Sequence, residues 1–318
     1  MKLTVLDGYT LNPGDNPWDE IASLGELVVY DRTPRELVVE RAKGSTVLFT
    51  NKTPIGEAEL AALPEVKLIC VLATGYNIVD CAAAAKRGIP VCNVPSYGTD
   101  SVAELVFALV LNNAKNVAAH AEAVAGGAWS AQPDYSFWLS TQHELAGKTM
   151  GVVGFGRIGR RVGELANAFG MRVIAYAPRP KDAPDWKGFE FVSLEKLLSE
   201  SDYVSLNCPL TANNAKMIGA AELELMKPEA YLINTARGQL IDSFALAKAL
   251  EDGVISGAAV DVLDTEPPAP DNPLIGAKNI TVTPHIAWAT VEARQRLMHV
   301  AAENVKAWLA GNTQNRVN

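Results

Sequence analysis

The chain has 318 residues, of which 48% are hydrophobic and 20% charged, so it can form two buried cores and is neither a disulfide-rich miniprotein nor a disordered acidic protein. The formal charge is −8, and no dense Lys/Arg stripe occurs, so we do not expect nucleic acid as a partner. The four cysteines show no C-x-x-C spacing, and we interpret them as buried thiols of a protein in a reducing compartment. The longest apolar stretch, residues 102–111, is too short for a membrane span, so we expect a cytoplasmic protein with no membrane partner.

Strand-like and helix-like segments alternate in the first part of the chain. Short β-branched runs occur at residues 3–6, 27–30, 46–49 and 67–72, and helix candidates at 34–42, 56–63 and 79–87. This alternation predicts an α/β fold with a parallel sheet and helices on both faces.

A long helix is predicted next, with Ser101 and Glu104 as a capping box at its start and Ala125 at its end. Its sequence is apolar around the whole circumference, which is more than a surface helix tolerates. We expect it to be buried either at a subunit interface or between domains.

The central segment repeats the alternation with six strand-like runs, at residues 149–153, 172–176, 203–207, 231–234, 258–260 and 280–283. Six strands suit a complete dinucleotide-binding sheet. The last segment, residues 290–309, predicts one amphipathic helix that has no sheet of its own and must pack on another part of the chain.

A glycine-rich turn follows the first of these central strands. The segment Gly154-Phe155-Gly156-Arg157-Ile158-Gly159 is a G-x-G-x-x-G between a strand and a helix. In such a turn the first glycine permits the tight bend, the second lets a pyrophosphate approach the backbone, and the third lets helix and strand pack closely. This context predicts dinucleotide binding rather than a merely structural turn.

The next strand ends without the acid that usually contacts the ribose of NAD. Ala177 stands where Asp or Glu is common, and Arg179 and Lys181 follow it. Ala177 removes the repulsion that excludes a 2′-phosphate, and the two cations could pair with one, although a solvated basic turn is the alternative. The expected cofactor is NAD(P)H, with NADPH favoured.

Three polar segments, residues 234–238, 261–267 and 283–288, each follow a predicted strand. They carry groups suited to carbonyl chemistry. Arg237 suits the carboxylate and carbonyl oxygen of a 2-keto acid, and His285 suits a proton donor near neutral pH. Glu266 can orient the imidazole and favour its protonated form. Taken singly, each residue fits an ordinary role better than a catalytic one: Arg237 a surface ion pair, Glu266 a loop charge and His285 a histidine whose hydrogen bonds are satisfied.

In the order and spacing of these motifs the sequence resembles the D-isomer-specific 2-hydroxyacid dehydrogenases over essentially its whole length. The resemblance rests on the glycine-rich turn, Cys208-Pro209-Leu210-Thr211, the segments 234–242 and 261–267, and Pro284-His285. It implies that Arg237, Glu266 and His285 are catalytic. It also implies that Asp261 holds the nicotinamide carboxamide, and that amides around Ala73, Thr74, Gly75 and Tyr76, with Arg237 and His285, bind the substrate. The expected cofactor contacts are Gly154, Phe155, Gly156, Arg157, Ile158, Gly159, Arg179, Cys208, Pro209, Thr235, Ala236, Asp261 and His285.

The resemblance further implies a split architecture. Residues 1–98 with 290–318 would form a flavodoxin-like substrate domain, and residues 99–289 a Rossmann-type cofactor domain that also mediates homodimerisation, with catalysis in the cleft between them.

Phe137-Trp138 and Trp288 most resemble glycerate dehydrogenases, also called hydroxypyruvate reductases. This resemblance predicts a small 2-keto or 2-hydroxy acid as substrate. These aromatic residues could equally belong to a core or an interface. The alternatives are a dehydrogenase of another keto acid and a nucleotide-sensing corepressor on the same scaffold. A formate dehydrogenase is disfavoured because it has Gln where Glu266 stands.

Overall fold

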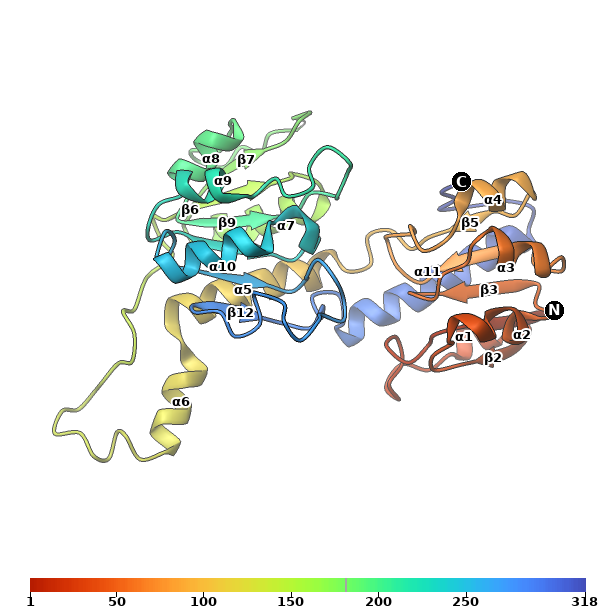
Figure 1. The fold of residues 1–318 in the computed structure, drawn as a ribbon, viewed down its shortest axis with the longest axis horizontal. Helices are drawn as coiled ribbons and strands as arrows, with labels where there is room; N and C mark the ends of the chain where they lie inside the picture. The colour runs from red at the N-terminus through yellow and green to blue at the C-terminus, as the bar shows by residue number, and fades with distance from the viewer. Residues whose placement is uncertain (181) are drawn as a thin grey trace. The chain divides into compact units, whose positions relative to one another are not determined.

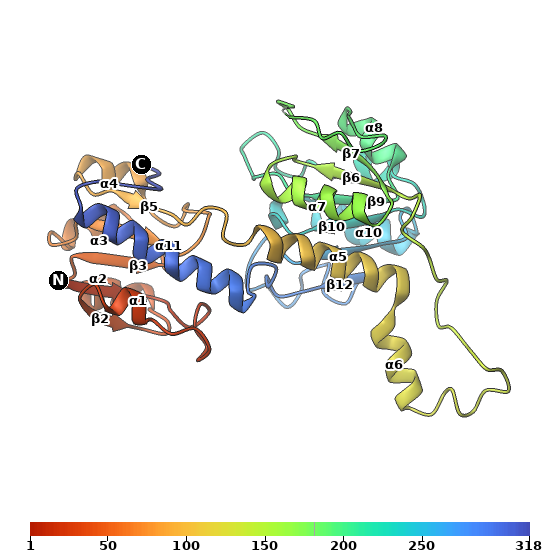
Figure 2. The same cartoon turned by 180° about the vertical axis from the view of Figure 1, so that it is seen from behind.

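The computed structural model describes residues 1–180 and 182–318, which divide into two compact units. Unit 1 comprises Met1–Gly98 and Trp288–Asn318, and unit 2 comprises Thr99–Ala287. Each unit has its own sheet, drawn in Figures 1 and 2, and is described here by itself.

Unit 1 contains a five-stranded sheet in the order β2-β1-β3-β4-β5. Its neighbouring strands all pair in parallel. Strands β3 and β4 are buried along their whole length, as expected where helices cover both faces. Because β2 and β3 lie on opposite sides of β1, the chain reverses its winding direction at β1. The strands are β1 (Lys2–Val5), β2 (Glu26–Val29), β3 (Val47–Thr50), β4 (Leu68–Val71) and β5 (Val91–Cys92).

Helices pack on both faces of this sheet and enclose two cores. The helix predicted at residues 290–309 is α11 (Val291–Leu309), and the Thr290 side chain caps it by accepting a hydrogen bond from the Ala293 amide at 3.3 Å. Its buried face, including Leu297, Ala301 and Val305, packs against one side of the sheet (Figure 2). The other helices are α1 (Asp19–Ala22), which the sequence did not predict, η1 (Arg35–Leu37), α2 (Val38–Ala42), α3 (Glu57–Ala62) and α4 (Cys81–Lys86).

Unit 2 contains a seven-stranded parallel sheet in the order β12-β11-β10-β9-β6-β7-β8. The six predicted strands are present, and the predicted α/β class with two helix-flanked parallel sheets is confirmed. The winding reverses between β6 and β9, where an open sheet of this kind places its ligand. The strands are β6 (Thr149–Val153), β7 (Arg172–Tyr176), β8 (Glu190–Phe191), β9 (Tyr203–Leu206), β10 (Tyr231–Asn234), β11 (Gly257–Val260) and β12 (Ile280–Val282); the helices are α7 (Arg157–Ala168), α8 (Leu194–Glu200), α9 (Ala220–Leu225), η2 (Gly238–Leu240) and α10 (Ser243–Asp252).

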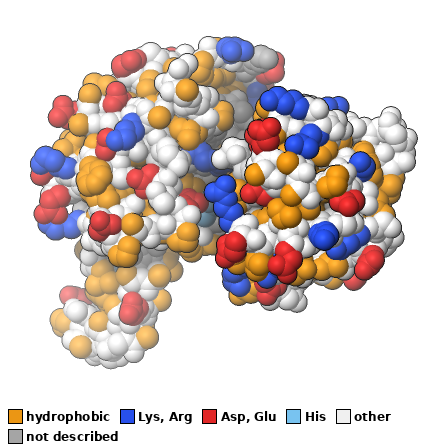
Figure 3. All heavy atoms as spheres, turned by 45° about the vertical axis from the view of Figure 1, so that its right-hand side comes forward, with side chains coloured by type: hydrophobic (Ala, Val, Ile, Leu, Met, Phe, Trp, Pro, Cys, Tyr) orange, Lys and Arg blue, Asp and Glu red, His pale blue; other side chains and the backbone are white. Residues whose placement is uncertain are grey.

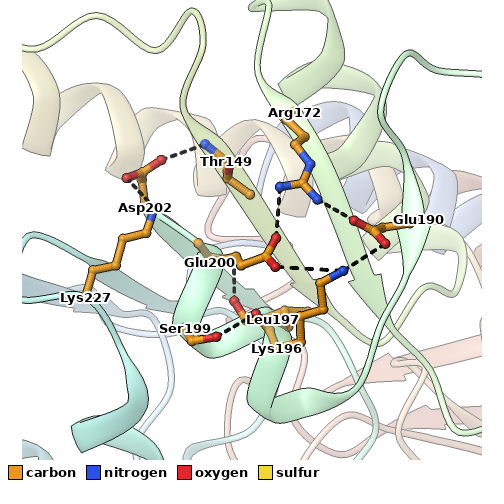
Figure 4. Close-up of polar contacts among 10 residues, drawn as sticks. Thr149, Arg172, Glu190, Lys196, Leu197, Ser199, Glu200, Asp202 and Lys227 are labelled. Atoms are coloured by element: carbon orange, nitrogen blue, oxygen red, sulfur yellow. Dashed lines mark hydrogen bonds and ion pairs between the residues drawn. The ribbon is translucent and has the colours of Figure 1, made fainter.

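The seventh strand, β8, is held at the sheet edge by ion pairs (Figure 4) and by the Phe191 side chain, which packs against the core of unit 2. Arg172 on β7 pairs with Glu190 on β8 and, at 2.9 Å, with Glu200 on α8. Lys196 lies 3.0 Å from Glu190, and hydrogen bonds from Lys196 and Arg172 lower the pKa of Glu190. A two-residue strand fixed in this way has no hydrophobic periodicity, so the sequence did not reveal it.

The long helix predicted to begin near Ser101 begins instead at Thr99 and breaks at Asn116, whose φ is 47°. Ser101 lies in its first turn and donates to the carbonyl of Ala287 at 2.5 Å, so the capping-box prediction is wrong. The two halves are α5 (Thr99–Lys115) and α6 (Val117–Ala125). Helix α5 is apolar because it is buried in the core of unit 2 against β6 and α7. Within the described residues no single helix meets the requirements of a membrane span, and only α5 and α6 together, across a 55° bend, do so by length and composition.

The four cysteines are free thiols, but the interpretation of all four as buried is wrong for two of them. Cys70 and Cys92 are buried on adjacent strands, and burial raises the pKa of Cys92 to about 11. Cys81 and Cys208 are partly exposed, because they lie at a helix start and beyond a strand end rather than inside the sheet.

Candidate active site

The glycine-rich turn has the geometry that a dinucleotide requires. Gly154 has a φ of +93°, and a side chain there would lie 2.7 Å from the Cys208 backbone. A Cβ on Gly159 would lie 2.0 Å from the carbonyl oxygen of Gly154, so only glycine lets α7 pack this closely. Gly156 precedes α7 and faces open space, which leaves the amides of the helix N-terminus accessible to a phosphate.

Two buried polar atoms at the carboxyl ends of neighbouring strands of unit 2 have no hydrogen-bond partner in the described part of the chain. They are Oδ1 of Asn207 and Oγ1 of Thr235, directly after β9 and β10. An unpaired buried polar atom costs about 1–3 kcal/mol, so these atoms fit a ligand that lies across the strand ends and completes their bonding. Thr235 was predicted as a cofactor contact and Asn207 was not, although its place as a polar residue ending a buried strand could have indicated it.

The segment after β7, expected to receive the adenosine end of the cofactor, is fixed by contacts that the sequence did not reveal. Arg160 of α7 places its guanidinium over the Phe155 ring, 5.2 Å from its centroid, and donates to the carbonyl oxygen of Asp182. The Phe155 ring also contacts Trp186 and two further rings, with centroid distances of 5.0–6.1 Å; those rings are Phe189 and Phe191. Phe155, predicted to contact the cofactor, therefore directs its ring into an aromatic cluster.

The predicted specificity residues lie beside this cluster. Ala177 is partly buried directly after β7, and Arg179 is exposed with no ion pair to another described residue. Lys181 lies outside the described residues.

His285 and Glu266 form a close pair. Nδ1 of His285 lies 2.6 Å from Oε2 of Glu266, whose Oε1 accepts a hydrogen bond from the Leu263 amide at 3.0 Å. Both carboxylate oxygens are therefore engaged, which fixes the orientation of the imidazole. The side chain of His285 is 28% exposed, and its Nε2 bonds to no other described residue, so this atom is available to a substrate.

Asp261 holds the turn that presents His285. Its buried carboxylate accepts hydrogen bonds from the Thr283 hydroxyl at 2.6 Å and from the amides of Ile286 and Ala287 at 2.9 and 2.8 Å. His285 has a φ of +55°, a conformation rare outside glycine, and its amide donates to the Asp261 carbonyl at 2.8 Å. The structure thus gives Asp261 a bonding role within the chain, and its contact with a nicotinamide carboxamide remains a prediction.

Arg237 lies in a turn that is packed against the segment carrying Glu266. The Asn234 side chain donates to the Arg237 carbonyl at 2.9 Å and accepts from the Ala236 amide at 3.0 Å. A side chain on Gly238 would lie 1.9 Å from the Leu263 backbone, so glycine is required for this approach. Arg237 is exposed, and the only hydrogen bond of its guanidinium to a described residue is from Nη1 to the Ala236 carbonyl. The three polar segments that the sequence singled out are therefore joined by direct contacts.

The predicted carboxylate-binding loop of unit 1 follows β4. The Thr74 hydroxyl donates to the Val94 carbonyl at 3.0 Å, and the Asn93 side chain donates to the Thr74 carbonyl at 2.7 Å. The amides of residues 73–76 bond to no other described residue. A loop that is fixed through its carbonyls and hydroxyl while its amides stay available suits an anion.

Comparison with known proteins identifies the family. The NAD binding domain of the D-isomer specific 2-hydroxyacid dehydrogenases matches residues 107–287. The chain belongs to this family. The hydroxypyruvate reductase of Blautia hydrogenotrophica is 43% identical over all of both chains. The glycerate dehydrogenase of Methylorubrum extorquens is 41% identical, over 90% of this chain and 89% of that protein.

A solved structure agrees with these relatives. The NADPH-dependent glyoxylate/hydroxypyruvate reductase of Sinorhizobium meliloti, in complex with NADP and malonate, superposes with a TM-score of 0.84 at 29% identity, over 99% of this chain and 96% of that one. These findings confirm the family inferred from the sequence, and membership makes this dehydrogenase a nicotinamide-dependent oxidoreductase.

Proposed function

We propose that this dehydrogenase reduces a small 2-keto acid of the hydroxypyruvate or glyoxylate type to the D-2-hydroxy acid with NAD(P)H, and catalyses the reverse oxidation. The observation that carries the proposal is the His285–Glu266 pair beside the Arg237 turn, in the unit that carries the dinucleotide turn. The names of the related hydroxypyruvate reductase and glycerate dehydrogenase support the substrate class.

The proposed roles follow from the positions of the atoms. A bound NAD(P)H supplies the hydride. The exposed guanidinium of Arg237 pairs with the substrate carboxylate and polarises the carbonyl, which stabilises the charge that develops on its oxygen. Nε2 of His285 donates a proton to that oxygen, while Glu266 keeps a proton on Nδ1 and stabilises the imidazolium. The free amides of residues 73–76 are proposed as further donors to the substrate carboxylate.

A substrate panel tests this function. The purified chain should oxidise NADPH or NADH with hydroxypyruvate and glyoxylate, with lower kcat/KM for pyruvate and for a branched keto acid, and chiral analysis of the product should find the D-isomer. A corepressor-like protein would bind the dinucleotide without turning over any of the four acids, and a dehydrogenase for another keto acid would prefer the branched acid.

The proposed cofactor preference is for NADPH. Ala177 offers no carboxylate to the ribose, and the exposed Arg179 has a planar fork that suits a phosphate. The Sinorhizobium meliloti relative is named NADPH-dependent. Ala177→Asp should shift the ratio of kcat/KM values toward NADH by about 1–3 kcal/mol, and Arg179→Ala should impair NADPH use selectively. A wild type that strongly prefers NADH, with a ratio unaffected by Arg179→Ala, would contradict the proposal.

We further propose a homodimer formed through unit 2. Helix α6 and the segment after it, residues 117–144 and hereafter the arm, extend away from the sheet of unit 2 (Figures 1 and 2). The arm exposes large apolar side chains, and a groove of about 540 Å³ lies between α6 and residues 137–142. Large exposed apolar patches mark interaction sites, and a second copy of the chain is the proposed occupant. The exposed side chains are Val117 (68%), Val124 (42%), Trp129 (50%), Tyr135 (91%), Trp138 (69%) and Leu139 (52%).

A further inference from the structure

Unit 1 contains a crevice that the proposed reaction does not use. It has a volume of about 280 Å³ and is lined by residues 7, 9–10, 31–33 and 52–54, which lie in the loops after β1, β2 and β3. The winding reversal at β1 sends the connections after β1 and β3 to opposite faces of the sheet. Open α/β sheets bind ligands at such a point, at the carboxyl ends of the strands.

One wall of the crevice is made by Asp7. Its carboxylate accepts hydrogen bonds from the successive amides of Asn51, Lys52 and Thr53, at 2.8, 2.6 and 2.7 Å. Three amides converging on one carboxylate tie the ends of β1 and β3 together and disperse the charge of Asp7. The other charged residues of the lining are Arg32, Lys52 and Asp31, of which Asp31 is exposed.

A stacking contact holds the Arg32 guanidinium in place and leaves its N–H donors unused by other described residues. Its guanidinium lies over the Tyr9 ring, 4.1 Å from the centroid, and makes no hydrogen bond or ion pair with another described residue. A stacked guanidinium keeps its N–H groups at its edge, where they can bind an anion bidentately. Behind it, Arg41 donates to the Arg32 carbonyl at 2.5 Å and to the Thr33 hydroxyl at 3.0 Å, which fixes the backbone and adds positive charge.

We propose that this crevice binds a small organic anion, through a carboxylate or phosphate group held by Arg32. An oriented guanidinium, a second cation and three threonine side chains surround a space of metabolite size. The anionic group belongs to a separate effector, because the carboxylate of the proposed keto-acid substrate is already assigned to Arg237.

Binding of inorganic phosphate to the full chain tests the site. The titration is made by calorimetry with saturating NADP⁺, so that the phosphate sites of unit 2 are filled. Wild type should bind phosphate saturably, and Arg32→Gln should bind phosphate at least ~10-fold more weakly. Tyr9→Leu should also lower the affinity for phosphate, because it removes the ring on which Arg32 is stacked. Asp31→Asn should raise the affinity for phosphate, because it removes a negative charge from the lining of the crevice.

Arg35→Gln is the matched control, because Arg35 is a nearby exposed cation of unit 1 that does not line the crevice. Phosphate binding that is unsaturable, or that weakens equally in Arg32→Gln and Arg35→Gln, would overturn the proposal. Steady-state kinetics then tests the effector role. Non-competitive inhibition by phosphate that is lost in Arg32→Gln supports this role, and inhibition that is competitive with the keto acid, or that Arg32→Gln retains, contradicts it.

Discussion

His285 shows how neighbouring groups prepare one side chain for one task. Glu266 occupies Nδ1 and Asp261 holds the backbone on which the ring is mounted, so Nε2 is the atom left for proton transfer. We expect His285→Ala and Arg237→Ala each to lower kcat at least ~100-fold, the usual scale for losing an acid catalyst or a charge stabiliser. Dissociation constants for NADPH, measured by fluorescence, should stay near wild type. Near-native turnover by either variant would refute its assigned role.

Glu266→Gln removes the negative charge of this side chain and keeps its size and shape. Glutamine can still reach the imidazole and the Leu263 amide, but it lacks the negative charge that stabilises the imidazolium. Glu266→Gln should therefore lower kcat for keto-acid reduction, while KM for NADPH stays near wild type. Steady-state kinetics of both proteins provides the measurement, and equal kcat values would remove Glu266 from this role.

Helix α7 fixes the segment that follows β7 through the side chain of Arg160. Arg160 contacts both Phe155 and Asp182, whereas its neighbour Arg161 pairs with Asp100 and Glu164. If Arg160 positions the adenosine end of the cofactor site, Arg160→Gln should raise KM for NADPH several-fold while kcat stays constant, and Arg161→Gln should change neither. Equal effects of both variants would mean that only the stability of α7 is being altered.

Helix α11 adds a buried cation, Arg294, to the apolar contacts that hold it against the rest of unit 1. Arg294 binds both carboxylate oxygens of Asp15, at 2.5 and 2.7 Å, and its hydrogen bonds lower the pKa of Asp15 below the ordinary 3.8. A lowered carboxyl pKa contributes stability above the unfolded value and loses it as the pH falls through the folded value. Asp15→Asn should therefore lower the urea midpoint at pH 7, and the gap from wild type should narrow below pH 3.8. A gap independent of pH would exclude this linkage.

The elements also show what could be predicted from sequence. Both sheets, α11 and the polar segments around Arg237, Glu266 and His285 followed from periodicity and from residue types after strands. Asn207 and the Arg160–Phe155 contact escaped prediction because they depend on atoms that only the folded chain brings together. The break at Asn116 was missed for a different reason, since one residue at positive φ leaves the apolar pattern of α5 and α6 unchanged.

At the scale of the whole molecule, the fold of a single chain does not explain the exposed apolar surface of the arm. Figure 3 shows hydrophobic side chains over this protruding part, and Trp138 alone is 69% exposed. Burying such a surface against a second copy would stabilise a dimer of twice 34.0 kDa. We expect light scattering to find that mass for wild type and a shift toward 34.0 kDa for Trp138→Ser combined with Val124→Ser. Phe244→Ser, at a site on α10 that is 73% exposed, removes a comparable apolar surface outside the arm and should leave the dimer intact. A monomeric wild type, or equal dissociation in the Phe244 control, would show that the arm is not the interface.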